Sequence, residues 1–229
     1  MGLFRGFGAF FQGMAFVVAK PRLWPRAMVP VATALALWTG LGALGAWAAV
    51  RLAHRLADGA LAAGALAVLF AVPAVVIALA LALALAQPLS GWALDGIVRE
   101  QRRALALAPL AETAALGAAA SSLAGGLLAF AIGAPTIAAL TLVGWLAPPA
   151  LAVTVPAKVV VAALLVAWDL TDYPLALRGV RLRDRLRWFG GRLGSMLGFG
   201  LAAVVFFSVP GLGLLALPFG VAGAARLVG

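Results

Sequence analysis

The sequence has no cysteine, one histidine and few charged residues. Without cysteine, disulfides, thiol catalysis and thiolate metal sites are excluded. Charged residues make up 10% of the chain, whereas a soluble domain usually has about 25%. The serines and threonines have no evident histidine partner for nucleophilic catalysis, and no phosphate-cradling glycine loop precedes a Lys-Ser or Lys-Thr pair. We therefore expect neither an enzyme nor a bound cofactor or metal.

Apolar sequence is abundant instead. Hydrophobic residues are 65% of the chain and the mean hydropathy is +1.12. A water-soluble protein of 229 residues could not bury this much apolar surface, so the chain must use lipid as its solvent. The net charge of +10 would suggest nucleic acid in a soluble protein. Here the basic residues lie between apolar runs, where they set topology and contact anionic headgroups. We expect membrane lipids as partners and no nucleic acid.

The N-terminal part of the chain predicts two kinds of membrane helix. In residues 1–20, four phenylalanines at three- and four-residue spacing predict an amphipathic helix that lies in the membrane interface. Residues 27–50 and 60–86 are apolar runs of about the length, on the order of 20 residues, that a membrane-spanning helix needs. They predict a transmembrane helical hairpin over residues 27–86.

Prolines divide the next apolar region, residues 113–168. Pro135, Pro148, Pro149 and Pro156 leave two stretches, 136–147 and 157–168, of about 12 residues each. At roughly 1.5 Å per residue these reach only about 18 Å, short of the ~30 Å hydrocarbon core. The pattern predicts a re-entrant hairpin that enters and leaves on one side. Residues 113–134 lie along the interface or span with a later arm.

The last apolar region, residues 193–226, is divided by Pro210 and Gly211 into arms too short for two crossings. It predicts a second re-entrant hairpin, with a single tilted crossing as the alternative. Residues 169–192 form a charged elbow between the two hairpins. The expected fold is therefore an all-α integral membrane protein in one membrane domain, with two long transmembrane helices, two re-entrant helical hairpins and an N-terminal interface helix.

Basic residues form clusters between these segments. If both late hairpins return to the side on which they start, every large cluster falls on one side, which the positive-inside rule identifies as the cytoplasm. This predicts a multi-pass protein of the bacterial inner membrane, inserted in one or both orientations. The clusters are Arg5, Lys20, Arg22 and Arg26; Arg99, Arg102 and Arg103; and the arginines of residues 178–192.

The elbow contains an acidic pair, Asp169 and Asp172, three residues apart on one helix face. Acidic groups at a membrane boundary need partners, and Arg178 and Arg181 are the nearest arginines that follow them in sequence. We expect a structural ion-pair elbow, with gating or proton coupling as the alternative role.

Three basic residues are candidates for binding an anion. Arg22 and Arg26 bracket the start of the first long helix, where free N–H groups suit an oxyanion and guanidinium adds matched donors. The alternative is headgroup contact and topology. Lys158 is the single charge between residues 113 and 168. It faces water or an anion if it lies deep in the membrane, and extends to the surface if its hairpin is shallow.

Three stretches together resemble the CysZ-like family of membrane proteins, which includes the eukaryotic etoposide-induced proteins. They are "PRLWPRAMVP" (21–30), "QPLSGWALDGIVRE" (87–100), and "WDLTDYPLALRGVRLRDRLR" (168–187) followed by "MLGFGLAAVVFFSVPGLGLLALPFGVAGAARLV" (196–228). The resemblance implies two long membrane helices, two hemi-penetrating hairpins and, for the bacterial branch, sulfate passage. Where that branch has an adjacent arginine pair, this chain has Trp24 and Pro25, flanked by Arg22 and Arg26.

These observations together predict an inner-membrane permease or channel for an inorganic anion, with sulfate as the candidate. We expect a homo-oligomer because one subunit has too few helices to enclose a pore. The alternative is a non-transporting membrane scaffold or lipid-organising protein.

Overall fold

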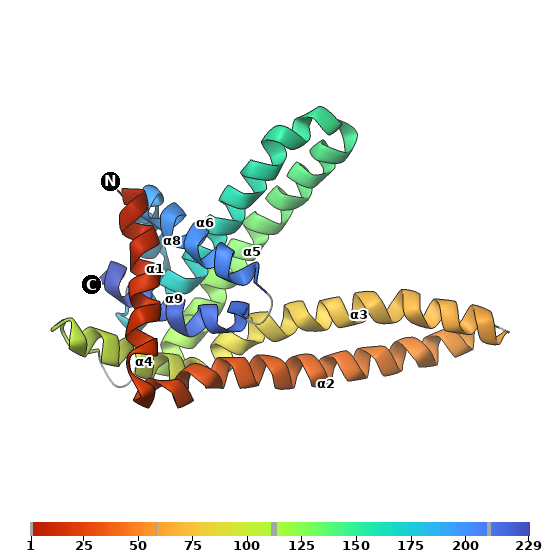
Figure 1. Ribbon diagram of the computed structural model, residues 1–229, viewed down its shortest axis with the longest axis horizontal. Coiled ribbons are helices and arrows are strands. Elements are labelled where there is room, and N and C mark those ends of the chain that lie inside the picture. The colour runs from red at the N-terminus through yellow and green to blue at the C-terminus, as the bar shows by residue number, and fades with distance from the viewer. Residues whose placement is uncertain (1, 58, 111–113, 210–211) are drawn as a thin grey trace. The chain divides into compact units, whose positions relative to one another are not determined.

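The computed structural model describes residues 2–57, 59–110, 114–209 and 212–229, which form helices and short connections with no β-strand (Figure 1). The expected all-α class is confirmed. The helices are α1 (Gly2–Val18), η1 (Pro21–Leu23), α2 (Trp24–Leu56), α3 (Ala60–Leu89), α4 (Gly91–Ala104), α5 (Ala114–Leu146), η2 (Pro148–Ala150), α6 (Leu151–Leu177), α7 (Leu182–Gly190), α8 (Leu193–Phe207) and α9 (Leu212–Val228).

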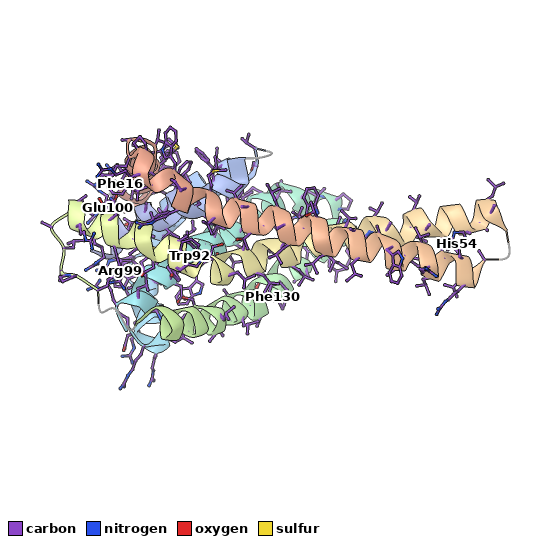
Figure 2. All side chains as sticks on the ribbon, turned by 90° about the horizontal axis from the view of Figure 1, so that it is seen from below. Phe16, His54, Trp92, Arg99, Glu100 and Phe130 are labelled. Atoms are coloured by element: carbon purple, nitrogen blue, oxygen red, sulfur yellow. The ribbon has the colours of Figure 1, made fainter. Side chains whose placement is uncertain are left out.

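The chain divides into two compact units, Met28–Ser90 and the remainder. The unit Met28–Ser90 is a hairpin of α2 and α3. That this hairpin crosses the membrane, as expected for 27–86, stays a prediction. Both helices continue through a proline, Pro30 in α2 and Pro73 in α3. Most of their large apolar side chains point outward, as expected for helices surrounded by lipid. His54 lies near the far end of this hairpin (Figure 2).

Among the residues that the structure describes, four helical segments are long and apolar enough to cross a membrane. This finding agrees with a membrane protein, and it includes more than the two long helices expected. The segments are Pro21–Leu56, Ala60–Leu79, Ser121–Leu146 and Pro148–Leu177.

The short arms expected in residues 113–168 are wrong as helix limits, because Pro135 lies inside α5 and Pro156 inside α6. Proline removes one backbone N–H, but hydroxyl side chains and neighbouring helices can satisfy the freed groups of a membrane helix. Next to Pro135, the Thr136 hydroxyl donates to the Ile132 carbonyl oxygen at 2.7 Å, one residue beyond the Ala131 carbonyl that the missing N–H leaves free. As a result α5 and α6 form one long antiparallel hairpin (Figure 1).

The end of α6 is set by a glycine five residues after Pro174. Gly179 has φ +72°, its N–H bonds to the Ala176 carbonyl, and the next N–H, from Val180, bonds to the Leu175 carbonyl. This is the Schellman arrangement, which ends helices at a left-handed residue. The chain then enters α7, and α7 and α8 meet at a bend of 92°.

The core of the second unit is built by α1, α6, α8 and α9. The predicted N-terminal helix is present as α1, and Phe10 is fully buried against Phe199 with ring centroids 5.8 Å apart. Phe4 is exposed, so the phenylalanines do not share one buried face. Between α8 and α9, Pro210 and Gly211, the predicted tip of the second hairpin, lie outside the described residues.

Candidate functional site

The charged face of α4 carries three arginines, Arg99, Arg102 and Arg103. The apolar face buries Leu94, Ile97 and Val98 and thereby holds the helix against the rest of its unit, and Arg102 lies at the edge of this face. The helix ends in another Schellman arrangement, with bonds from the N–H groups of residues 106 and 107 to the carbonyls of residues 103 and 102. Ala106 takes the left-handed position at φ +52°, unusual for a residue other than glycine. This turn folds residues 107–110 back beside the arginines.

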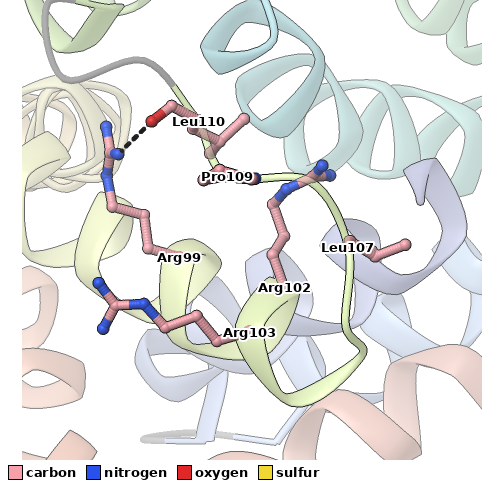
Figure 3. Close-up of a pocket in the computed structure, with 6 residues that line it drawn as sticks. All are labelled: Arg99, Arg102, Arg103, Leu107, Pro109 and Leu110. Atoms are coloured by element: carbon pink, nitrogen blue, oxygen red, sulfur yellow. Dashed lines mark hydrogen bonds between the residues drawn. The ribbon is translucent and has the colours of Figure 1, made fainter.

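Two of the arginines hold this returning segment by its backbone. Arg102 donates from Nε and Nη2 to the Ala108 carbonyl oxygen, at 3.2 and 2.8 Å. Arg99 donates from Nη1 to the Leu110 carbonyl oxygen at 2.8 Å (Figure 3). The side chains and the segment enclose a cavity of about 170 Å³. It is lined by Arg99, Arg102, Arg103, Leu107, Pro109 and Leu110.

Two of the three arginines at this cavity have a carboxylate nearby. Arg99 pairs with Asp95 at 2.8 Å, and Arg103 lies 3.7 Å from Glu100. Arg102 is only 7% exposed, and no carboxylate pairs with it in the described part of the chain. Burial lowers the pKa of the Arg102 guanidinium, and the positive charge of Arg178 lowers it further. A buried cation without a counter-ion is costly, which makes Arg102 the point where an anion would be favoured.

Glu100 is engaged from the other side of α4 by Lys20. The Lys20 ammonium donates to the Glu100 carboxylate at 3.0 Å and lies 4.4 Å from the centre of the Phe16 ring. Figure 2 shows Phe16 and Glu100 at the same end of the unit. The hydrogen bond and charge of Lys20 lower the pKa of Glu100, and the charges of Arg103 and Arg26 add to this effect. Glu100 therefore remains ionised and draws these cations together.

The three residues predicted to bind an anion are not brought together. Arg26 lies against α4, where a Cβ on Gly96 would be 3.0 Å from the Arg26 Cδ. Arg22 is exposed in η1 and has no hydrogen bond or ion pair with the described residues. Lys158 is half-buried about two turns into α6, beside the α5–α6 turn, which is far from the α1–α2 junction (Figure 1). Lys158 also lacks a polar partner within the described ranges. Anion binding by these residues stays a prediction.

A family model described as "Sulfate transporter CysZ/Etoposide-induced protein 2.4" matches residues 9–218. The chain belongs to this family. The match confirms the resemblance seen in the sequence, and together with the apolar helices it identifies a membrane protein. No curated protein matches the chain.

In this CysZ-family chain the buried acid of the elbow has a different partner from the one expected. Asp172, which is 2% exposed, accepts a hydrogen bond from Arg185 Nη1 at 2.6 Å. Arg185 is 1% exposed, and its Nη2 donates to the Ser121 hydroxyl of α5. The pair therefore joins α5, α6 and α7 at one buried point.

The other three residues of the predicted elbow lie elsewhere. Arg178 donates to the Val228 carbonyl oxygen and so holds the end of α9. Arg181 is exposed at the start of α7, and Asp169 is half-buried on α6. Arg185 could have been found from the spacing of α7, because Arg185 and Phe189 are four residues apart and share its inner face. Phe189 packs on Trp168 with ring centroids 5.4 Å apart.

Proposed function

We propose that this protein is a permease or channel for an inorganic anion, with sulfate as the substrate, in the inner membrane of a bacterium. The observation that supports it most is Arg102, a buried cation beside a cavity with no carboxylate partner among the described residues. Membership of a family described as containing a sulfate transporter supports the choice of anion.

The chemistry of the cavity favours an oxyanion. Its guanidinium groups offer several N–H donors in a planar fork, which fits the oxygens of sulfate. In the structure Arg99 and Arg102 donate to neutral carbonyl oxygens of residues 108 and 110. A hydrogen bond with one ionised partner is already stronger than a bond between neutral groups. An oxyanion adds its own negative charge to that of the guanidinium, which a carbonyl oxygen does not. An entering oxyanion would therefore compete with the returning segment for the same donors.

Replacing Arg102 by glutamine should weaken sulfate binding about tenfold or more, since a hydrogen bond to a charged group contributes about 1.5–3 kcal/mol. The measurement is the sulfate concentration that protects the purified protein against heat, together with sulfate entry into proteoliposomes. Sodium chloride at matched ionic strength removes the contribution of screening. The double variant Arg22→Gln, Arg26→Gln tests the other candidate site in the same assays.

Comparing Arg102→Gln with the double variant shows which of the two candidate sites binds sulfate. Loss of sulfate-specific protection in Arg102→Gln alone supports the α4 cavity, and loss in the double variant alone transfers the site to the start of α2. Arg102→Lys, which keeps the charge, controls for a folding defect. If the wild type shows neither sulfate-specific protection nor flux, the permease proposal is wrong and a non-transporting scaffold is favoured.

We further propose that α2 and α3 cross the membrane and that the α5–α6 and α8–α9 hairpins enter and leave on the cytoplasmic side. The helices α8 and α9 have 15 and 17 residues, which at 1.5 Å per residue reach about 23–26 Å, less than the ~30 Å core. The longer helices α5 and α6 could cross the membrane by length alone. For them, the resemblance to the family supports a hairpin that enters the membrane and returns to the same side. A homo-oligomer would enclose the pore.

Single cysteines in this cysteine-free chain test that topology. In cells, a membrane-impermeant reagent should label His54→Cys from outside, and should not label Arg103→Cys or Arg183→Cys. The decisive position is the exposed Ala147, at the α5–α6 turn. Ala147→Cys should stay unlabelled from outside, and a permeant reagent verifies that the thiol is reactive. External labelling of Ala147→Cys would show that α5 and α6 cross completely. Labelling of Arg183→Cys would place the elbow outside.

A further inference from the structure

A second cavity, of about 440 Å³, lies where α5, α6 and α7 meet. Small and apolar side chains form much of its wall, including Ala124 of α5, Ala176 of α6 and Leu182 of α7. Its polar lining comes from Ser121, Arg181 and Arg185. The cavity thus joins an apolar wall to a basic rim, and it is separate from the α4 arginines.

The polar side of this cavity is suited to an anionic group. Arg181 is the N-cap residue of α7 and makes no side-chain capping bond, so the first N–H groups of that helix face their surroundings with a partial positive charge. Arg185 supplies an independent sign of a missing partner. It is 1% exposed, it lines the cavity, and its buried Nε has no hydrogen-bond partner. Because Asp172 neutralises Arg185, the net positive charge comes from Arg181 and the helix end.

The position of the cavity indicates the source of that anion. Its lining includes Ser121, the first residue of the apolar segment Ser121–Leu146, and Ala176, near the end of Pro148–Leu177. Both segments are candidates to cross the hydrocarbon core, and the cavity lies at the ends from which they would enter it. A cavity at that boundary, apolar on one side and basic on the other, matches the chemistry of a phospholipid, with its phosphate at the headgroup level and its chains beside α5.

We propose that this cavity binds the phosphate headgroup of an anionic phospholipid. The phosphate lies against Arg181 and the N-terminal N–H groups of α7, beside the buried Arg185, while the acyl chains lie along Ala124 and the neighbouring surface of α5. The bound lipid fixes α7 at the membrane surface and covers the buried Asp172–Arg185 pair. This site does not depend on the proposed transport of sulfate.

The test is a titration of the purified full-length protein in detergent with short-chain phosphatidylglycerol, with bound lipid counted by native mass spectrometry. Arg181→Gln should bind this lipid about tenfold more weakly, the size expected for losing one hydrogen bond to a charged group. Arg183→Gln is the matched control, since Arg183 is also exposed on α7 and carries the same charge but does not line the cavity. It should bind as the wild type does.

A second pair of variants changes shape and leaves every charge in place. Gly117 lines the cavity, and a Cβ there would meet nothing within 4 Å. Gly117→Leu should therefore fold normally and fill the space, with at least a tenfold loss of phosphatidylglycerol binding. Gly126 of α5 is equally open but lies outside the cavity lining, so Gly126→Leu should leave binding unchanged.

Three results would overturn the proposal. Equal weakening by Arg181→Gln and Arg183→Gln would indicate attraction to the surface as a whole, without a site. Equal binding of phosphatidylcholine would remove the requirement for a net anionic headgroup. Inorganic phosphate or sulfate that displaces the lipid at similar concentrations would identify a site for a free oxyanion. If Arg102→Gln loses sulfate flux but still binds the lipid, the two sites are independent and the lipid proposal stands.

Discussion

Replacing Asp172 with asparagine is expected to lower the free energy of unfolding in detergent by about 3–5 kcal/mol. The carboxylate is 2% exposed and lies 2.6 Å from Arg185, which is itself buried. Asparagine keeps the size of the side chain and removes its charge, so the guanidinium becomes a buried cation without a counter-ion. The cost arises mainly from that desolvated, unpaired charge. The measurement is the thermal or denaturant midpoint of the purified protein.

An exposed acid of the same segment provides the control. Asp184 lies 3.9 Å from Arg187, and both side chains are more than half exposed. Asp184→Asn should change stability by about 1 kcal/mol at most, since exposed ion pairs contribute little. The double variant Asp172→Asn, Arg185→Gln should be less destabilised than the sum of the two single variants, because these residues contact each other. Equal effects of Asp172→Asn and Asp184→Asn would show that the buried pair carries no special energy.

Much of the fold could be predicted from the apolar runs and from the turn residues that separate them. The hairpin of α2 and α3 and the break between α8 and α9 follow from run length and from turn residues. The prediction is wrong at the prolines, which the sequence pattern predicts to end helices. Pro135 and Pro156 lie inside helices, because a proline in an apolar helix gives up one N–H while neighbours satisfy the freed carbonyl. Gly179 ends α6, since its left-handed conformation permits the Schellman arrangement.

The candidate sites were harder to predict because they depend on contacts between distant segments. Charge alone marked Arg99, Arg102 and Arg103, but their sequence is also typical of a solvated helix end. The cavity exists because the chain turns back at Ala106, and alanine gives no signal of a left-handed turn. The nearest arginines following Asp172 in sequence suggested the wrong partner. Its actual partner, Arg185, is 13 residues away on a separate helix. The spacing of α7 can mark Arg185 as an inward-facing residue, but which acid it meets depends on how α7 packs.

Packing of α1 on α8 should show the other large effect, because glycines at this contact, Gly6 among them, have no Cβ to separate the two helices. A Cβ built on Gly6 would lie 1.7 Å from the carbonyl oxygen of Ser195, far inside van der Waals contact. The obstacle is backbone, so no side-chain rotation can relieve it. Close approach of helices at small residues is typical of membrane proteins. We expect Gly6→Ala to force α1 away from α8 and to disturb the burial of Phe10.

Gly8 of the same helix provides a matched control for Gly6→Ala. A Cβ there would meet nothing within 4 Å, and alanine is favoured over glycine inside a helix by about 1 kcal/mol. Gly8→Ala should therefore leave the thermal midpoint unchanged or raise it. Gly6→Ala carries the same gain in helix propensity, yet it should lower stability by about 1–3 kcal/mol or more, the range for overpacking. Because the two variants differ only in what the added methyl group meets, similar midpoints would mean that α1 does not pack on α8 as the structure has it.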